Sequence, residues 1–124
     1  MGFIVRGFLI TAVLYGLLGL GYGLMMAITQ DHGQMPTHAH IMVIGWVSFA
    51  IFGMFYKQYE EGVSLGLAKA HFWLAQISLL VLVIALTMVY SGNGAGDPIA
   101  AVSAIAYSVS FLVFSVVALK AVRA

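Results

Sequence analysis

Two histidines, His38 and His40, stand where a short polar segment passes into a long apolar run that ends near Tyr56. An imidazole in hydrocarbon is costly unless it gains a partner, so histidines at the mouth of a membrane segment are candidate metal or haem ligands. The chain has four histidines and no cysteine. Iron–sulfur clusters, Cys zinc sites, disulfides and covalently attached haem c are therefore excluded, and imidazole, thioether or a haem macrocycle would have to hold any metal.

The spacing of these two histidines argues against a shared ion. Residues two apart on a helix project about 200° from each other, so His38 and His40 should face opposite sides and serve different neighbours. His71 lies in another apolar run. If the two runs form a hairpin, His71 sits about 20 Å in depth from His40, at 1.5 Å per residue. One iron cannot then be bound by both residues within a single chain.

The two remaining histidines are further ligand candidates with ordinary alternatives. His71 adjoins Phe72 and Trp73, so it is either an aromatic-belt residue at the membrane interface or a ligand. His32 lies in the polar segment, where it is either solvated or part of a metal site.

Composition sets the surroundings of these residues. The chain is 63% hydrophobic and 7% charged, with a mean hydropathy of +1.07, which is typical of a protein in a lipid bilayer. Four apolar runs reach the length of about 20 residues that a membrane span needs. We predict an all-α integral membrane protein of one domain, residues 1–124, whose four transmembrane helices form an up-down-up-down bundle. The spans are expected at about 3–29, 38–56, 67–90 and 98–122.

Turn residues support these boundaries. Pro36 is well placed to start the second helix with Thr37 as its cap, and Pro98 follows a glycine-rich turn and should open the last helix.

The basic residues predict an orientation. All five fall on one side of a four-span topology, so both termini should be cytoplasmic, in what we expect to be a bacterial inner membrane. His38 and His40 then lie toward the outer face. The net charge of +1 gives no reason to expect nucleic acid as a partner. The basic residues are Arg6, Lys57, Lys69, Lys120 and Arg123.

The run HAHIMVIGWVSFAIFGMFY, from His38 to Tyr56, resembles the tenth helix of the catalytic subunit of haem-copper oxidases, particularly the cbb-type branch. The segment AHFWLAQI, residues 70–77, is similar to the start of the next helix of that subunit. In the family, the first histidine of the H-x-H pair is the axial ligand of the high-spin haem and the second binds the low-spin haem. The resemblance implies these roles for His38 and His40, and it covers roughly a third of the chain.

The chain also departs from this family. The family's copper site needs three histidines on other helices, and its low-spin haem needs one more, whereas only His32 and His71 are present here besides the pair. We therefore do not expect a complete oxygen-reducing centre within one chain, and the sequence leaves open whether the chain is an enzyme. The expected cofactor is haem b held by His40, with His38 at a second site, for electron transfer or for sensing and binding a diatomic gas.

Small residues and a methionine extend the candidate site. Gly19 and Gly23 form a small-xxx-small pair, and they and Gly45 predict either close helix contacts or a haem plane lying against bare backbone. Met25 lies near the level of His40, so a His/Met ligand pair is a further option.

Two other classes of function remain open. A copper-binding protein would use an outer-face site, because imidazole and thioether suit copper. A non-catalytic accessory subunit of a respiratory complex, or a multidrug-type transporter, needs no metal. The transporter is disfavoured because all four acids, Asp31, Glu60, Glu61 and Asp97, fall in predicted loops. The copper site would consist of His32, Met35, His38 and His40.

We expect a homo-oligomer, with a trimer slightly preferred over a dimer. One chain offers no third histidine at a suitable depth, so a bis-His haem needs a ligand from a neighbouring protomer. The twelve helices of the family's catalytic subunit form three arcs of four, which three copies of this chain would rebuild.

Overall fold

The structure, a computed structural model, describes all 124 residues and contains four long helical spans and no strand. The first span is α1 (Gly2–Thr29), and the second is a continuous rod made of α2 (Met35–His40), η1 (Ile41–Val47) and α3 (Ser48–Gln58). A short 3-10 turn, η2 (Glu60–Gly62), leads to α4 (Leu65–Val89), and α5 (Gly96–Arg123) completes the chain. All four spans are long and apolar enough to cross a membrane, which confirms the predicted fold class.

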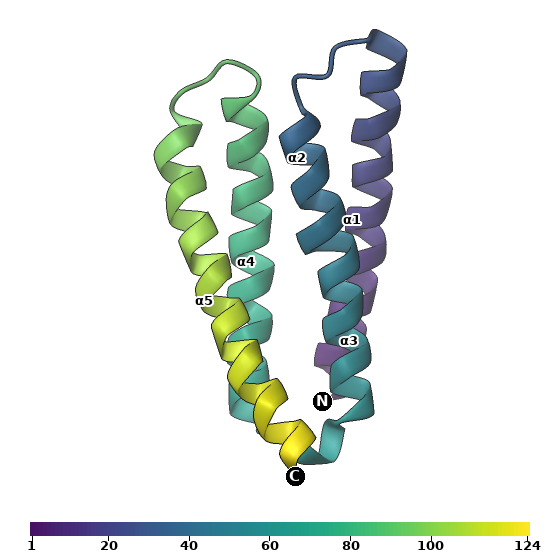
Figure 1. Cartoon of the computed structure of the whole chain (residues 1–124), viewed down its shortest axis with the longest axis vertical. Coiled ribbons are helices and arrows are strands. Elements are labelled where there is room, and N and C mark those ends of the chain that lie inside the picture. Colours follow the sequence, from purple (N-terminus) through teal and green to yellow (C-terminus); the bar gives the residue numbers. More distant parts are fainter.

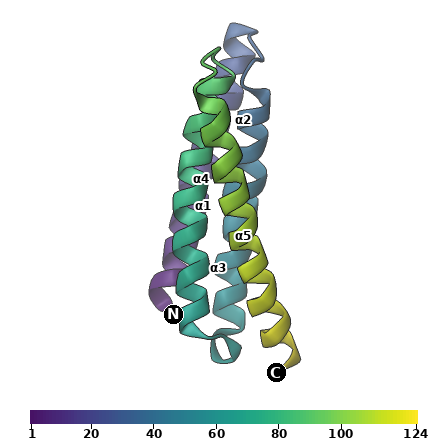
Figure 2. The ribbon, with the colours of Figure 1, turned by 90° about the vertical axis from the view of Figure 1, so that its left-hand side faces the viewer.

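The spans alternate in direction and group into two hairpins. Figure 1 shows α1 beside α2 and α3, and α4 beside α5, with the N- and C-termini at the same end. Figure 2 shows the same alternation from the side. We call this the termini end, and we call the opposite end, with the α1–α2 and α4–α5 connections, the loop end.

Charge is distributed unequally between the two ends. The five basic residues lie in the first two turns of α1, the last turn of α3, the first two turns of α4 and the last turn of α5, all at the termini end. At the loop end, the only residues of the types Asp, Glu, Lys and Arg are Asp31 and Asp97.

Glycines allow α1 and the second span to pack closely. Gly16, Gly19 and Gly23 lie directly beneath the side chains of Trp46, Met42 and His38, which descend the second span in antiparallel register. In return, Tyr15 packs on Gly45 and Leu9 packs on Gly53. A Cβ atom at Gly19 would overlap Met42, so this face of α1 is fitted to its neighbour.

Large side chains, rather than small ones, join the two hairpins at the termini end. Phe8 of α1 stacks edge-on against Phe72 of α4 at a centroid distance of 5.0 Å, and Phe52 of α3 packs against Phe114 of α5 at 4.5 Å. At the loop end the link is polar, because the Tyr22 hydroxyl lies 2.7 Å from the Thr87 hydroxyl and Gln34 Nε2 donates to the Thr87 carbonyl.

A π-helical segment, η1, follows the H-x-H pair directly and was not expected from the sequence. Its wider turn leaves carbonyls available for other donors. Ser48 Oγ donates to the carbonyl of Val43, and the Tyr107 hydroxyl of α5 donates to that of Ile44 at 2.9 Å. Such segments often mark functional sites.

The start of the second span differs from the prediction. The helix begins at Met35 with Gln34 at the N-cap, and Thr37 is buried and donates its hydroxyl to Gln34 Oε1 at 2.7 Å. The predicted cap at Thr37 is therefore wrong, because its hydroxyl orders the Gln34 side chain instead of capping the helix.

Candidate functional site

His38 lies against α1. Its Nδ1 is 2.8 Å from the carbonyl oxygen of Gly19, and its ring rests on Gly23, where a Cβ would approach the ring to 3.1 Å. A carbonyl can only accept a hydrogen bond, so Nδ1 carries the proton and Nε2 keeps its lone pair. Nε2 makes no hydrogen bond within the protein and is not fully buried, so its lone pair is free for a ligand.

His40 faces away from α1 and is exposed on the outside of the bundle. Its Nδ1 lies 2.7 Å from the carbonyl oxygen of Pro36, one turn earlier in the same helix. The same argument therefore assigns the proton to Nδ1 and the lone pair to Nε2. A histidine that binds metal through Nε2 usually donates its Nδ1–H to another group, which fixes the orientation of the ring.

His38 and His40 make the same kind of hydrogen bond but project from opposite sides of the helix, as their spacing predicts. No group of three His, Cys, Asp or Glu side chains gathers in this chain. The predicted copper site of His32, Met35, His38 and His40 is therefore not assembled, since His38 turns inward, His40 turns outward, and His32 is exposed in the connecting loop.

The other predicted cofactor contacts lie elsewhere. Gly19 and Gly45 are covered by Met42 and Tyr15, so the structure makes them helix contacts and leaves no bare backbone for a haem plane there. Gly23 makes room for the His38 ring. Met25 is about 200° around α1 from Gly23 and lines a cavity toward α4, so no His/Met pair forms within the chain.

His71 is enclosed, with no exposed surface. Four aromatic rings surround its imidazole at centroid distances of 4.6 to 5.7 Å, and its Nδ1 lies 2.8 Å from the Tyr56 hydroxyl. The aromatic-belt alternative is therefore wrong, because rings from the other three spans seal His71 from the interface. The four rings belong to Phe8, Phe52, Tyr56 and Phe114.

Hydrogen bonding assigns the opposite tautomer to His71. Tyr56 is fully buried, and its hydroxyl has His71 as its only hydrogen-bond partner. The hydroxyl proton is therefore donated to Nδ1 of His71. Nε2 then carries the second proton and has no conventional acceptor. Its N–H faces aromatic surroundings, which act as weak acceptors. In this state His71 offers no lone pair to a metal.

His38 and His40 each offer the ligand atom that a haem iron needs, but their positions limit where a haem could lie. Both Nε2 atoms are available, which is what an axial ligand requires. However, neither histidine lines any of the three main cavities. A macrocycle on His40 would lie on the outer surface of the bundle, where Val43 and Val47 are exposed apolar neighbours along the same span.

Three residues that link the two hairpins at the loop end were not identified from the sequence. The positions of Gln34, Tyr22 and Thr87 depend on hydrogen bonds between segments far apart in the chain. The Tyr56–His71 pair had a partial signal, because the two residues lie near the facing ends of consecutive apolar runs, on either side of the η2 turn.

Comparison of the chain with protein-family models, with curated proteins and with solved structures finds no match.

Proposed function

We propose that this chain is a haem b-binding integral membrane protein in which His40 supplies an axial ligand and His38 supplies a ligand at a second site. One observation carries the proposal. Both imidazoles at the loop end are fixed by Nδ1–H bonds to backbone carbonyls, at 2.8 and 2.7 Å, and keep a free Nε2 lone pair. A polar imidazole exposed on a membrane span needs a partner, and a haem iron is one.

Electron transfer, or binding of a diatomic gas, is the task that such a cofactor would serve. Haem b supplies an iron that cycles between two oxidation states, with a potential set by its axial ligands and its surroundings. The chain's own contribution is to hold the two rings in fixed orientations and to separate them on opposite faces of one helix. The resemblance of residues 38–56 to haem-copper oxidases supports the same assignment.

The exposed position of His40 favours an assembly of several copies. Within the chain, His38 is bonded to α1 and His71 is fully buried, so a bis-His haem at His40 would take its other ligand from a neighbouring protomer. We propose a homo-oligomer, with a trimer preferred over a dimer. Native mass spectrometry in mild detergent tests this, and a haem-loaded monomer would refute the shared ligand.

We further propose that both termini face the cytoplasm of a bacterial inner membrane. The support is the gathering of all five basic residues at the termini end. Reporter fusions at the C-terminus test the orientation, and an external C-terminus would overturn it.

The ligand assignment is tested by the haem content of purified variants. His40→Ala should lower the haem occupancy of the His40 site by about tenfold or more, which corresponds to about 1.4 kcal/mol or more of binding free energy, so that only haem bound at His38 remains. His32→Ala is the matched control, because it removes an exposed histidine from the same end of the bundle and should leave the haem-to-protein ratio unchanged. Equal haem content in both variants would refute the assignment.

The response of the haem spectrum to carbon monoxide distinguishes gas binding from electron transfer. A rapid spectral shift of the reduced protein would show an open coordination position and indicate gas binding. An unchanged spectrum would show two firm axial ligands and indicate electron transfer.

A further inference from the structure

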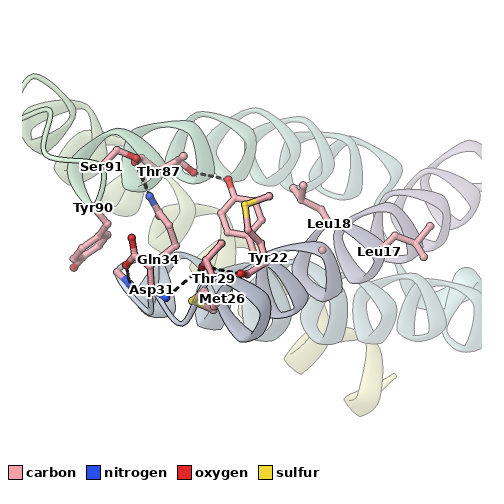
Figure 3. Close-up of a pocket in the computed structure, with 13 residues that line it drawn as sticks. Leu17, Leu18, Tyr22, Met26, Thr29, Asp31, Gln34, Thr87, Tyr90 and Ser91 are labelled. Atoms are coloured by element: carbon pink, nitrogen blue, oxygen red, sulfur yellow. Dashed lines mark hydrogen bonds between the residues drawn. The ribbon is translucent and has the colours of Figure 1, made fainter.

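A cavity separate from both histidines opens between α1 and α4 at the loop end. Its volume is about 720 Å³, within the range of small-molecule sites. Figure 3 shows Tyr90, Ser91 and Asp31 at one end, Leu17 and Leu18 at the other, and Tyr22 and Met26 between them. From Thr29 to Leu17 the cavity follows α1 for about 18 Å, so it extends from the membrane surface well into the hydrocarbon layer.

The polar end of this cavity has one charged group, the Asp31 carboxylate. Its Oδ1 accepts the N–H of Gly33 at 3.0 Å, which fixes the side chain, while Oδ2 makes no hydrogen bond or ion pair within the protein. No lysine or arginine lies at the loop end to neutralise it. An anionic head group would therefore be repelled, and a cationic one attracted.

The other polar groups restrict what else the cavity can recognise. Gln34 has both amide protons engaged, one by the Thr87 carbonyl and one by Ser91 Oγ at 2.9 Å. The Thr87 hydroxyl donates to Val83, so the Tyr22 hydroxyl donates to Thr87. These amide and hydroxyl protons are therefore already used, so among these side chains only the Ser91 and Tyr90 hydroxyls keep a proton that could be donated to a ligand.

Aromatic and apolar groups complete the site. Tyr22 is half-buried and Tyr90 is exposed, and both line the cavity, with Tyr90 at the same end as Asp31 and Tyr22 in the middle. Tyrosine rings attract organic cations through their π faces. Leucine and methionine side chains at the deeper end would accept apolar substituents.

We propose that this cavity binds a lipophilic organic cation, with Asp31 as its counter-ion, Tyr90 at the charged end, the Tyr22 ring farther along the wall, and the apolar end holding its hydrocarbon groups. This site is independent of the haem proposal, since it uses neither histidine and lies on the opposite face of α1 from Gly23 and His38.

Two probes of the same shape and opposite charge provide the first test. Tetraphenylphosphonium should bind the purified protein saturably, one per chain, in equilibrium dialysis with empty detergent micelles as the background. Tetraphenylborate should bind at least about tenfold more weakly, because Asp31 repels it. Equal binding of the two probes, or binding that does not saturate, would overturn the proposal.

Paired variants locate the site. Asp31→Asn keeps an oxygen for the Gly33 N–H and should weaken tetraphenylphosphonium binding about tenfold, or about 1.4 kcal/mol. Asp97→Asn removes the same charge from the same end of the bundle but outside the cavity, so it should change binding less than about twofold. Equal effects of the two variants would refute Asp31 as the counter-ion and leave only a diffuse surface charge.

A third variant tests the cavity without changing charge. Gly21 lines the cavity, and a Cβ built there meets nothing within 4 Å. Gly21→Leu should therefore fold normally, occupy part of the cavity and weaken binding of the cation. Unchanged binding in a folded Gly21→Leu protein would show that the probe binds elsewhere.

Discussion

The two ends of the bundle hold their histidines in opposite ways. At the termini end, His71 is sealed by four aromatic rings and bonded to a buried tyrosine. At the loop end, His38 and His40 are tied only to backbone carbonyls and keep Nε2 accessible. The same residue type is thus a core element at one end and a candidate ligand at the other, and the hydrogen-bond partner of Nδ1 distinguishes them.

The packing at the two ends agrees with this difference. Aromatic rings fill the space between the hairpins at the termini end, whereas at the loop end a cavity of about 720 Å³ opens between α1 and α4 and only polar side chains such as Tyr22 and Thr87 bridge them. Stability is therefore expected to depend mostly on the termini end, and ligand binding on the loop end.

The largest expected contrast is in the histidine tautomers of the protein without haem. We expect the proton on Nδ1 in His38 and His40 and on Nε2 in His71, because a carbonyl accepts from the first two and the Tyr56 hydroxyl donates to the third. NMR of ¹⁵N-histidine-labelled protein measures this. A proton on Nδ1 of His71 would contradict the distinction between the two ends.

The next largest effect concerns the pair Tyr56 and His71. Tyr56→Phe leaves Nδ1 of His71 without a donor in a buried site and should lower the free energy of unfolding by about 1–3 kcal/mol. Tyr56→Phe with His71→Phe removes both polar groups, so its stability should return close to that of the unchanged protein. Unfolding in detergent measures both. Additive losses in the double variant would show that the two residues are not coupled.

Hydropathy was sufficient to predict the four spans, because the bilayer sets the length of an apolar run. Helical spacing also predicted that His38 and His40 face opposite sides. The enclosure of His71 was not predictable, because its surrounding rings come from the other three spans and depend on their packing. The same limit explains why Gly19 and Gly45 could be interpreted as haem contacts: sequence shows that a glycine is present, but not which side chain covers it.

A smaller effect is expected from a methyl group beneath His38. Gly23→Ala would place a Cβ 3.1 Å from Cε1 of His38 and displace the ring from the Gly19 carbonyl. Gly21→Ala is the matched control, because its Cβ meets nothing within 4 Å. Both variants gain similar helix propensity. The free energy of unfolding of Gly23→Ala should therefore be lower than that of Gly21→Ala by about 1 kcal/mol, the typical contribution of one hydrogen bond. Equal stabilities would mean that the ring moves without losing its bond.

The smallest effect is expected at the π segment, where Tyr107 links α5 to the second span. Its hydroxyl donates to the Ile44 carbonyl at 2.9 Å, and Tyr107→Phe should cost about 0.6 kcal/mol, the average for hydrogen bonds between membrane helices. Tyr59→Phe is the control, since the Tyr59 side chain is 38% exposed and its hydroxyl makes no hydrogen bond. Hydrogen exchange should report the change locally, as faster exchange across residues 41–47 in Tyr107→Phe alone. Because η1 begins directly after His40, a loosened segment should also allow the histidine pair to reorient. Unchanged exchange in this segment would show that the π turn is maintained by α1 packing rather than by the bond from α5.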